Sequence, residues 1–286
     1  MSAYAIHGAS AALERALEAD VVVLPIPGTC GNVGQLACDV LALNLNLARV
    51  GGVDFEHLAP VCGRDAIFDD LGRGPNASGA LASACEVYAG TIEADASSSG
   101  RERTACVVQI RSDACVGARR AFCEEYAKFI VTHFSKASRI VLCSSLPSTL
   151  GESAAQIGGT KWRRCRGDAT FNSACDACEL VELEENARLS TEEMSTSVDP
   201  HWSLLDTLNA VDGATRVGCL LAVCSEGDNS VDGAGMALAA ARSCGIELGP
   251  SPKDPVPGET YIGPFRVPRS WDSLFGLRKH RRDMYG

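Results

Sequence analysis

The feature that most constrains the fold is a repeated order of apolar strand, short loop and amphipathic helix. Four apolar runs have the length and composition of strands buried on both faces, at 20–25, 104–110, 139–143 and 217–224. Apolar residues at helical spacing follow three of these runs, over 36–47, 118–136 and 231–243. This alternation predicts an α/β fold with a largely parallel sheet flanked by helices on both faces.

The length of 286 residues allows one large α/β domain. We expect a single domain over 1–277, interrupted by an irregular insertion at about 151–205. That insertion carries a glycine pair, a basic cluster and then an acidic run. The last nine residues, 278–286, differ from the domain because they hold four cationic side chains against one acid. They are expected to form a basic C-terminal tail.

The overall charge and the aromatic content argue against nucleic acid as a partner. The net charge is −10, and an acidic body repels a phosphate backbone. Only 6% of the residues are aromatic, which disfavours a platform for stacking single-stranded bases.

The 14 cysteines could suggest a disulfide framework, but their positions favour free thiols. Several lie inside apolar runs, where a thiol packs as a small hydrophobic group, and no secretory signal precedes them. We therefore expect a reducing, intracellular environment. No apolar run approaches the roughly 20 residues needed to span a bilayer, so no membrane partner is predicted.

A glycine-rich loop after the first strand raises the possibility of a nucleotide site. A strand leads through Gly28, Gly31 and Gly34 into a helix, and helix N-termini bind phosphates. The spacing is G-x-x-G-x-x-G rather than G-x-G-x-x-G, and no P-loop lysine follows. The alternative is that Gly31 and Gly34 permit close packing of helix on sheet, with Asn32 capping the helix.

Other catalytic and metal-binding patterns are weak. Cys175 and Cys178 form a single Cys-x-x-Cys, whereas a structural zinc site needs a second pair, and neither Cys165 nor His201 forms one. No Gly-x-Ser-x-Gly elbow is present, and none of the five histidines lies beside an obvious nucleophile. We therefore predict no metal, no cofactor and no catalytic residues.

The loop Ser225–Asn229 follows the last buried strand, where α/β enzymes place active-site residues. It lacks the alternating acids of a calcium loop. From the residues alone it is either a weak polar site or a tight turn in which Asn229 caps the next helix.

Several short segments, taken together, resemble one family. They occur in order along the chain as Leu24-Pro25, Gly31-Asn32-Val33-Gly34-Gln35-Leu36-Ala37 with Asp39, Glu86-Val87-Tyr88, Gln109-Ile110-Arg111-Ser112, Phe122-Cys123-Glu124, Val141-Leu142-Cys143-Ser144-Ser145, Ser225-Glu226-Gly227-Asp228-Asn229, and Val267-Pro268-Arg269-Ser270-Trp271 with Leu274-Phe275-Gly276. This series is similar to the proteasome assembly chaperone 2 family.

The resemblance implies a nucleoside phosphorylase-like or hydrolase-like α/β fold without enzymatic activity. It further implies a heterodimer with proteasome assembly chaperone 1 that binds the α subunits of the core-particle α-ring. Such a heterodimer promotes ring assembly and blocks premature or off-pathway association, in the cytoplasm and the nucleus. The alternative is a small-molecule enzyme on the same fold, since a fold alone does not determine function.

The resemblance also gives the C-terminal tail a role. A hydrophobic residue, a tyrosine and a final residue form an ending that enters pockets between neighbouring α subunits. The residues expected to bind the partner are Met284, Tyr285, Gly286, Arg278, Lys279, Arg281 and Arg282. The tyrosine would bury apolar area, the terminal carboxylate would pair with a lysine, and the basic residues would be attracted to acidic rim residues.

Overall fold

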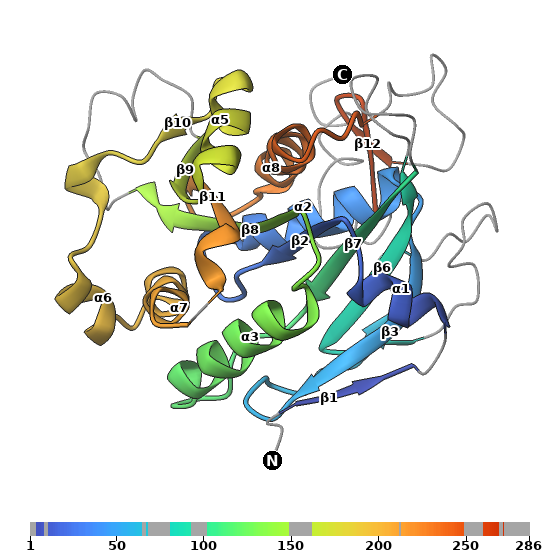
Figure 1. The fold of residues 1–286 in the computed structure, drawn as a ribbon, viewed down its shortest axis with the longest axis horizontal. Helices are drawn as coiled ribbons and strands as arrows, with labels where there is room; N and C mark the ends of the chain where they lie inside the picture. Colours follow the sequence, from blue (N-terminus) through green and yellow to red (C-terminus); the bar gives the residue numbers. More distant parts are fainter. Residues whose placement is uncertain are drawn as a thin grey trace, which may run out of the picture.

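The structure is a computed structural model that describes residues 4–8, 11–64, 67, 81–92, 102–148, 162–211, 213–248, 260–268 and 271. Its central element is a nine-stranded sheet (Figure 1). In spatial order the strands are β1 (Tyr4–His7), β3 (Ala48–Phe55), β6 (Cys85–Ile92), β7 (Arg103–Ile110), β2 (Val21–Pro25), β8 (Arg139–Pro147), β11 (Val217–Cys224), β9 (Trp162–Arg166) and β10 (Val181–Glu182).

The middle of the sheet is parallel, because β7, β2, β8 and β11 pair in parallel. On one side, β6, β3 and β1 continue the sheet in antiparallel pairing, and on the other side β9 pairs antiparallel with β11. The predicted α/β class is therefore confirmed, and the parallel part is its central four strands.

Helices cover both faces of the sheet, as Figure 1 shows. One face packs against α1 (Ala11–Leu17), α3 (Arg119–His133) and α7 (Pro200–Asn209), with the short α6 (Thr191–Thr196) beside α7. The other face packs against α2 (Val33–Asn44), α8 (Ser230–Ser243) and α5 (Ala169–Ala177). Each face thus has its own apolar core.

The central strands are mainly apolar and are buried along most of their length, because both of their faces are covered. Every residue of β2 is buried, and β11 is buried except at Val223. One face of the sheet packs an aromatic cluster in which Phe55 makes edge contacts with Phe122, Tyr126 and Phe129. The four strands and three helices expected from the sequence are all present.

Two regions differ from the expectations. The described part of the expected insertion, 162–205, is regular, since it contains β9, α5, β10, α6 and the start of α7. The strands of this region were not predicted because they contain no apolar run. β9 lies near the edge of the sheet and holds three arginines. The helix α2 ends at Asn44, before the end of the predicted range 36–47. The chain then enters β3, which contains Gly51 and Gly52 and pairs irregularly with β6.

Two small two-stranded sheets lie outside the main sheet, formed by β4 (Gly63–Arg64) with β5 (Leu81–Ala82) and by β12 (Thr260–Ile262) with β13 (Phe265–Val267). The second is held to α2 by Asn44, whose side chain donates to the Arg266 carbonyl at 2.7 Å. Within the described ranges, no helix has the length and apolar character needed to cross a membrane.

Candidate functional site

The loops after β2, β8 and β11 meet at the carboxyl edge of the parallel strands. Ser145, near the end of β8, donates to the carbonyl of Cys30 at 2.5 Å. Beyond it, the hydroxyls of Ser148 and Ser225 lie 2.9 Å apart. In an open α/β sheet this edge is the usual place for a ligand, so its contents decide what the fold can bind.

At the centre of this edge, side chains from the loop after β11 cover the residues that precede α2. Glu226 accepts a hydrogen bond from the Gly31 amide at 3.3 Å, in the position where a phosphate oxygen would bind. The amide of Asn229 covers Gly31 so closely that a Cβ there would lie 2.2 Å from its Nδ2. A carboxylate at a helix N-terminus repels a second anion, so this edge is poorly suited to a nucleotide.

The glycine-rich loop has the packing role expected for it. A Cβ at Gly34 would lie 2.2 Å from the carbonyl oxygen of Cys143 in β8. Gly34 therefore allows the first turn of α2 to lie directly on the sheet. The expected caps are different, because Asn32 has a left-handed backbone and its side chain makes no cap hydrogen bond.

Asn229 also stands at the N-cap position of its helix without capping it. Its Nδ2 donates to the carbonyl of Ser225 at 2.9 Å, which closes the loop instead. Asp228 takes over the capping role, because its carboxylate accepts from the Ser230 amide at 3.0 Å. Ser225–Asn229 is thus a closed turn between β11 and α8.

Two thiols lie under this turn, and neither has the character of a nucleophile. The Cys224 thiol lies 3.4 Å from the Cys30 carbonyl, and the Cys30 thiol lies 3.6 Å from the Cys224 carbonyl. Burial, reinforced by Cys224, raises the pKa of Cys30 to about 12. At neutral pH the thiol is therefore protonated, and a protonated thiol is a weak nucleophile.

A buried network of charged and polar side chains lies beside the same edge, between α2 and strands β3, β6 and β7. Its centre is Arg111, whose guanidinium lies 3.1 Å from Asp39 and 3.2 Å from Glu86. Glu86 also contacts Arg49 at 2.6 Å and accepts from the Tyr88 hydroxyl at 2.8 Å. Two cations and two carboxylates thus compensate one another inside the protein.

The network extends into α2 through two glutamines. Gln109 donates to Asp39 at 2.6 Å, and Gln35 donates to the Ile110 carbonyl at 2.9 Å. Burial acts to lower the pKa of Arg111, but Asp39, Tyr88 and Glu86 outweigh it and hold the pKa above its ordinary value. Arg111 therefore stays charged and holds α2 to the sheet.

This network was not predicted from the sequence, although all of its members except Arg49 stand in segments that carry the family resemblance. Gln35 and Asp39 belong to the segment that begins at Gly31, Glu86 and Tyr88 to the next, and Arg111 to the one after that. A polar residue facing inward from an apolar strand was the available signal. Its partners come from strands that are distant in the sequence, so the pairing itself could not be predicted.

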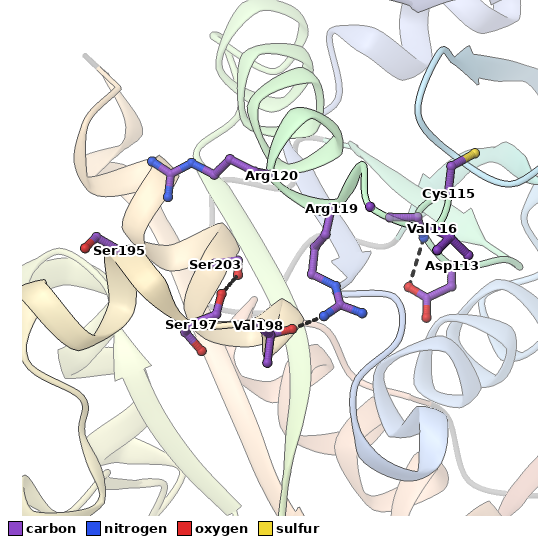
Figure 2. Close-up of a pocket in the computed structure, with 11 residues that line it drawn as sticks. Asp113, Cys115, Val116, Arg119, Arg120, Ser195, Ser197, Val198 and Ser203 are labelled. Atoms are coloured by element: carbon purple, nitrogen blue, oxygen red, sulfur yellow. Dashed lines mark hydrogen bonds between the residues drawn. The ribbon is translucent and has the colours of Figure 1, made fainter.

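A cavity of about 670 Å³ opens beside the start of α3, as shown in Figure 2. Arg119 lies in it and donates to the carbonyl of Val198. Its Nε is buried and has no hydrogen-bond partner among the residues that the structure describes. Val116 and Val198 line the same cavity and are highly exposed. The cavity therefore combines a cation with an apolar rim.

A second cluster joins β9, α7 and β11. The sulfur of Cys165 lies 3.9 Å from His201 Nε2, and the ligand atoms of Cys165, His201 and Cys219 lie within 4.8 Å of one another. On the other side of the ring, the Ser144 hydroxyl lies 2.8 Å from His201 Nδ1. His201 thus lies beside two thiols, an arrangement that the sequence did not indicate because the three residues come from separate elements.

The two thiols of this cluster differ in acidity. A hydrogen bond with Cys219, supported by His201, lowers the pKa of Cys165 to about 5, although burial acts in the opposite direction. Burial raises the pKa of Cys219 well above its ordinary value. All fourteen cysteines are free, including Cys175 and Cys178 at the end of α5.

The residues predicted to bind the partner all lie outside the described residues. They are Arg278, Lys279, Arg281, Arg282, Met284, Tyr285 and Gly286. Their docking role stays a prediction from the sequence.

Comparison with known proteins gives structural relatives only. No family model matches the sequence, and no curated protein matches it. The fold is similar to that of Pyrococcus furiosus PbaA, an archaeal homologue of proteasome-assembly chaperone, with a TM-score of 0.51 and 13% identity over 80% of each chain. It is also similar to P. furiosus PbaB, an archaeal proteasome activator, with a TM-score of 0.51 and 14% identity over 86% of this chain and 91% of that one. At these identities the likeness shows a shared fold.

Proposed function

We propose that this protein is a proteasome assembly chaperone that acts without catalysis, as a heterodimer with proteasome assembly chaperone 1 on the α-ring of the core particle. One observation carries the proposal. Three of the segments behind the family resemblance meet in the Arg111 network, in a fold shared with archaeal proteins described as a proteasome-assembly chaperone homologue and a proteasome activator.

The carboxyl edge of the sheet supports a binding function over a catalytic one. An enzyme of this fold would need an anion cradle or an acid–base pair at this edge. Glu226 and Asn229 occupy the start of α2, and burial keeps the Cys30 thiol protonated. Calorimetry with purine nucleosides, ATP and NAD should therefore show no saturable binding, and micromolar affinity for any of them would favour the enzyme alternative.

Within this proposal the folded domain and the tail have separate tasks. The domain pairs with the partner chaperone, and residues 278–286 dock on the α-ring. Tyr285 would supply apolar contact, and the Gly286 carboxylate would pair with a lysine in a pocket between α subunits. Because Gly286 has no side chain, the pocket would recognise the terminal carboxylate itself.

The decisive test is binding of the purified heterodimer to immature core particles, measured by surface plasmon resonance. Deletion of Met284 to Gly286 should accelerate dissociation strongly, and Tyr285→Ala should cost about 2 kcal/mol or more, as for an interface anchor. Addition of one residue after Gly286 should cost roughly 2–5 kcal/mol, because the pocket cation loses its partner. Unchanged dissociation of the deletion variant would refute docking by the tail.

The control for these variants is the heterodimer itself. Co-expression with proteasome assembly chaperone 1 should yield a one-to-one complex for the wild type and for all tail variants. A wild-type chain that remains a stable monomer in the presence of that partner would contradict the proposed heterodimer, whatever the tail does.

A further inference from the structure

We infer that Cys165, His201 and Cys219 form a binding site for one zinc ion. The inference stands apart from the proposed docking function, because none of these residues belongs to the tail. It also differs from the expectation of no metal, which rested on the single Cys-x-x-Cys of Cys175 and Cys178 and on the absence of a second pair from Cys165 or His201.

The ligand set suits zinc. Thiolate sulfur and imidazole nitrogen are common zinc ligands, and a set of two cysteines and one histidine binds zinc with the fourth position left for water. Two thiolates and a neutral imidazole give a complex with no net charge, which is the form that a protein interior tolerates best. Neighbouring Arg166 has its guanidinium directed at the carbonyls of Ala214 and Val217, at 2.7 and 2.6 Å, and a neutral complex would not repel it.

The distances are close to those of a metal-bound site. With bonds of about 2.3 Å to sulfur and 2.0–2.1 Å to nitrogen, tetrahedral ligands of zinc lie about 3.6–3.8 Å apart. Cys165 Sγ and His201 Nε2 are 3.9 Å apart, and all three ligand atoms lie within 4.8 Å. Side-chain movements of less than about 1 Å would therefore bring the three atoms to bonding positions.

The ring nitrogen of His201 that faces away from the thiols already has a polar partner. Ser144 Oγ lies 2.8 Å from His201 Nδ1, so this hydroxyl can accept a hydrogen bond from the Nδ1–H group. In that tautomer the lone pair on Nε2 is directed toward Cys165. Metal-binding histidines almost always have such a partner on their second nitrogen. The ring is fully buried and its helix begins at the Asp199 cap, which fixes the position of His201.

Access also fits a metal site. His201 and Cys219 are fully buried, whereas Cys165 is only partly buried and gives the ion a route from solvent. Bound zinc would join β9 and α7 to β11 of the central sheet. It would thus fasten the described part of the expected insertion, 162–205, to the body of the protein.

The test is zinc content of the full-length chain after dialysis, measured by elemental analysis. We expect about one equivalent in the wild type and a large loss in the double variant Cys165→Ser with Cys219→Ser. The matched control is Cys175→Ser with Cys178→Ser, which should keep its zinc. Equal loss in both variants, or no zinc in the wild type, would overturn the site.

Two further measurements test the site without removing a ligand, so that they do not depend on whether the double cysteine variant folds. Titration of the metal-free wild type with Co²⁺ should produce sulfur-to-cobalt charge-transfer absorption, and its absence would contradict the inference. Ser144→Ala retains all three ligands and should weaken zinc binding by roughly 10–100-fold. A Cys165–Cys219 disulfide that excludes metal in freshly purified protein would also overturn the site.

Discussion

Among single residues, Gly34 has the strictest requirement for a missing side chain. Its hypothetical Cβ would lie 2.2 Å from the carbonyl oxygen of Cys143, which belongs to a central strand and cannot move away. Alanine favours helix by about 1 kcal/mol over glycine, so propensity alone predicts stabilisation by Gly34→Ala. Because the clash requires α2 to shift from the sheet, we expect a net loss of about 1–3 kcal/mol in chemical denaturation.

The control for Gly34 is Gly63→Ala, since no atom of the described residues lies within 4 Å of a Cβ at Gly63. That variant should be within about 0.5 kcal/mol of the wild type. Equal stability of the two variants would show that α2 does not pack against β8 as closely as described here.

Two histidines should give the stability opposite dependences on pH. The hydrogen bond to Glu125 raises the pKa of His57 in the folded protein. The stabilisation that His57 provides is therefore complete below pH 6.5 and is lost as the pH rises through the raised pKa. Burial lowers the pKa of His133 in the folded protein. The stability associated with the neutral ring is therefore present above pH 6.5 and is lost as the pH falls through the lowered pKa.

Substitution separates the two effects. His57→Gln should flatten the decline in the free energy of unfolding above pH 6.5, and His133→Gln should flatten the decline below it. Denaturant titrations between pH 5 and 9 measure both, roughly within the range where histidine changes charge. A decline above pH 6.5 that persists in His57→Gln would assign it to another group.

The role of a single residue can be predicted from the sequence when its partners are close to it along the chain. Gly34 was predictable because a glycine in the first turn after a buried strand has a local reason. The capping role of Asn229 was wrong because the loop geometry assigns that role to Asp228. The cluster around His201 was not predictable, since Cys165 and Cys219 reach it from two other elements.

Between elements, the contact of α2 with α8 depends on Gly233. A Cβ at this position would lie 2.4 Å from the Cβ of Leu36 in α2. Although Gly233→Ala should favour the helix by about 1 kcal/mol, separation of the two helices should cost about 1–3 kcal/mol. We expect net destabilisation in thermal unfolding, while Val231→Ala on the exposed side of α8 should change little.

The Arg111 network joins α2 to strands β3, β6 and β7. Arg111→Leu would leave the buried Asp39 carboxylate with the amide of Gln109, and Glu86 with Arg49. Removal of one partner from a buried ion pair costs about 3–5 kcal/mol, and the remaining contacts place this variant at the lower end. Lys136→Leu breaks a pair with Glu18 in which both side chains are exposed, and it should cost at most about 1 kcal/mol. Similar losses in both would contradict a structural role for the network.

For the elements, sequence periodicity was sufficient where both faces of a strand are covered. The four central strands each contain an apolar run and were all predicted. The outer strands β3 and β9 were not, because β3 carries two adjacent glycines and three of the five residues of β9 are arginines. Near the edge of the sheet, a strand needs no continuous apolar run, so its sequence resembles that of a loop.

For the whole molecule, the charge of the tail should affect the rate of association. The body is acidic and residues 278–286 are basic, so the tail should be attracted to acidic residues at the rim of its target. Substitution of Arg278, Lys279, Arg281 and Arg282 by glutamine should slow association at low salt. The difference from the wild type should largely disappear at high salt, where charges are screened. A salt-independent loss would assign these residues to direct contacts within the pocket.

The strand order has a consequence for how the chain is made. β2 ends at residue 25, but its neighbour β8 begins only at residue 139. At about 5–20 residues per second, the ribosome needs roughly 6–23 seconds to supply that neighbour. During this interval one of the most apolar strands has no partner on one side, and β11 follows later still. The nascent chain is therefore most vulnerable to aggregation before its middle is synthesised, and slower translation between 25 and 139 should lower the soluble yield.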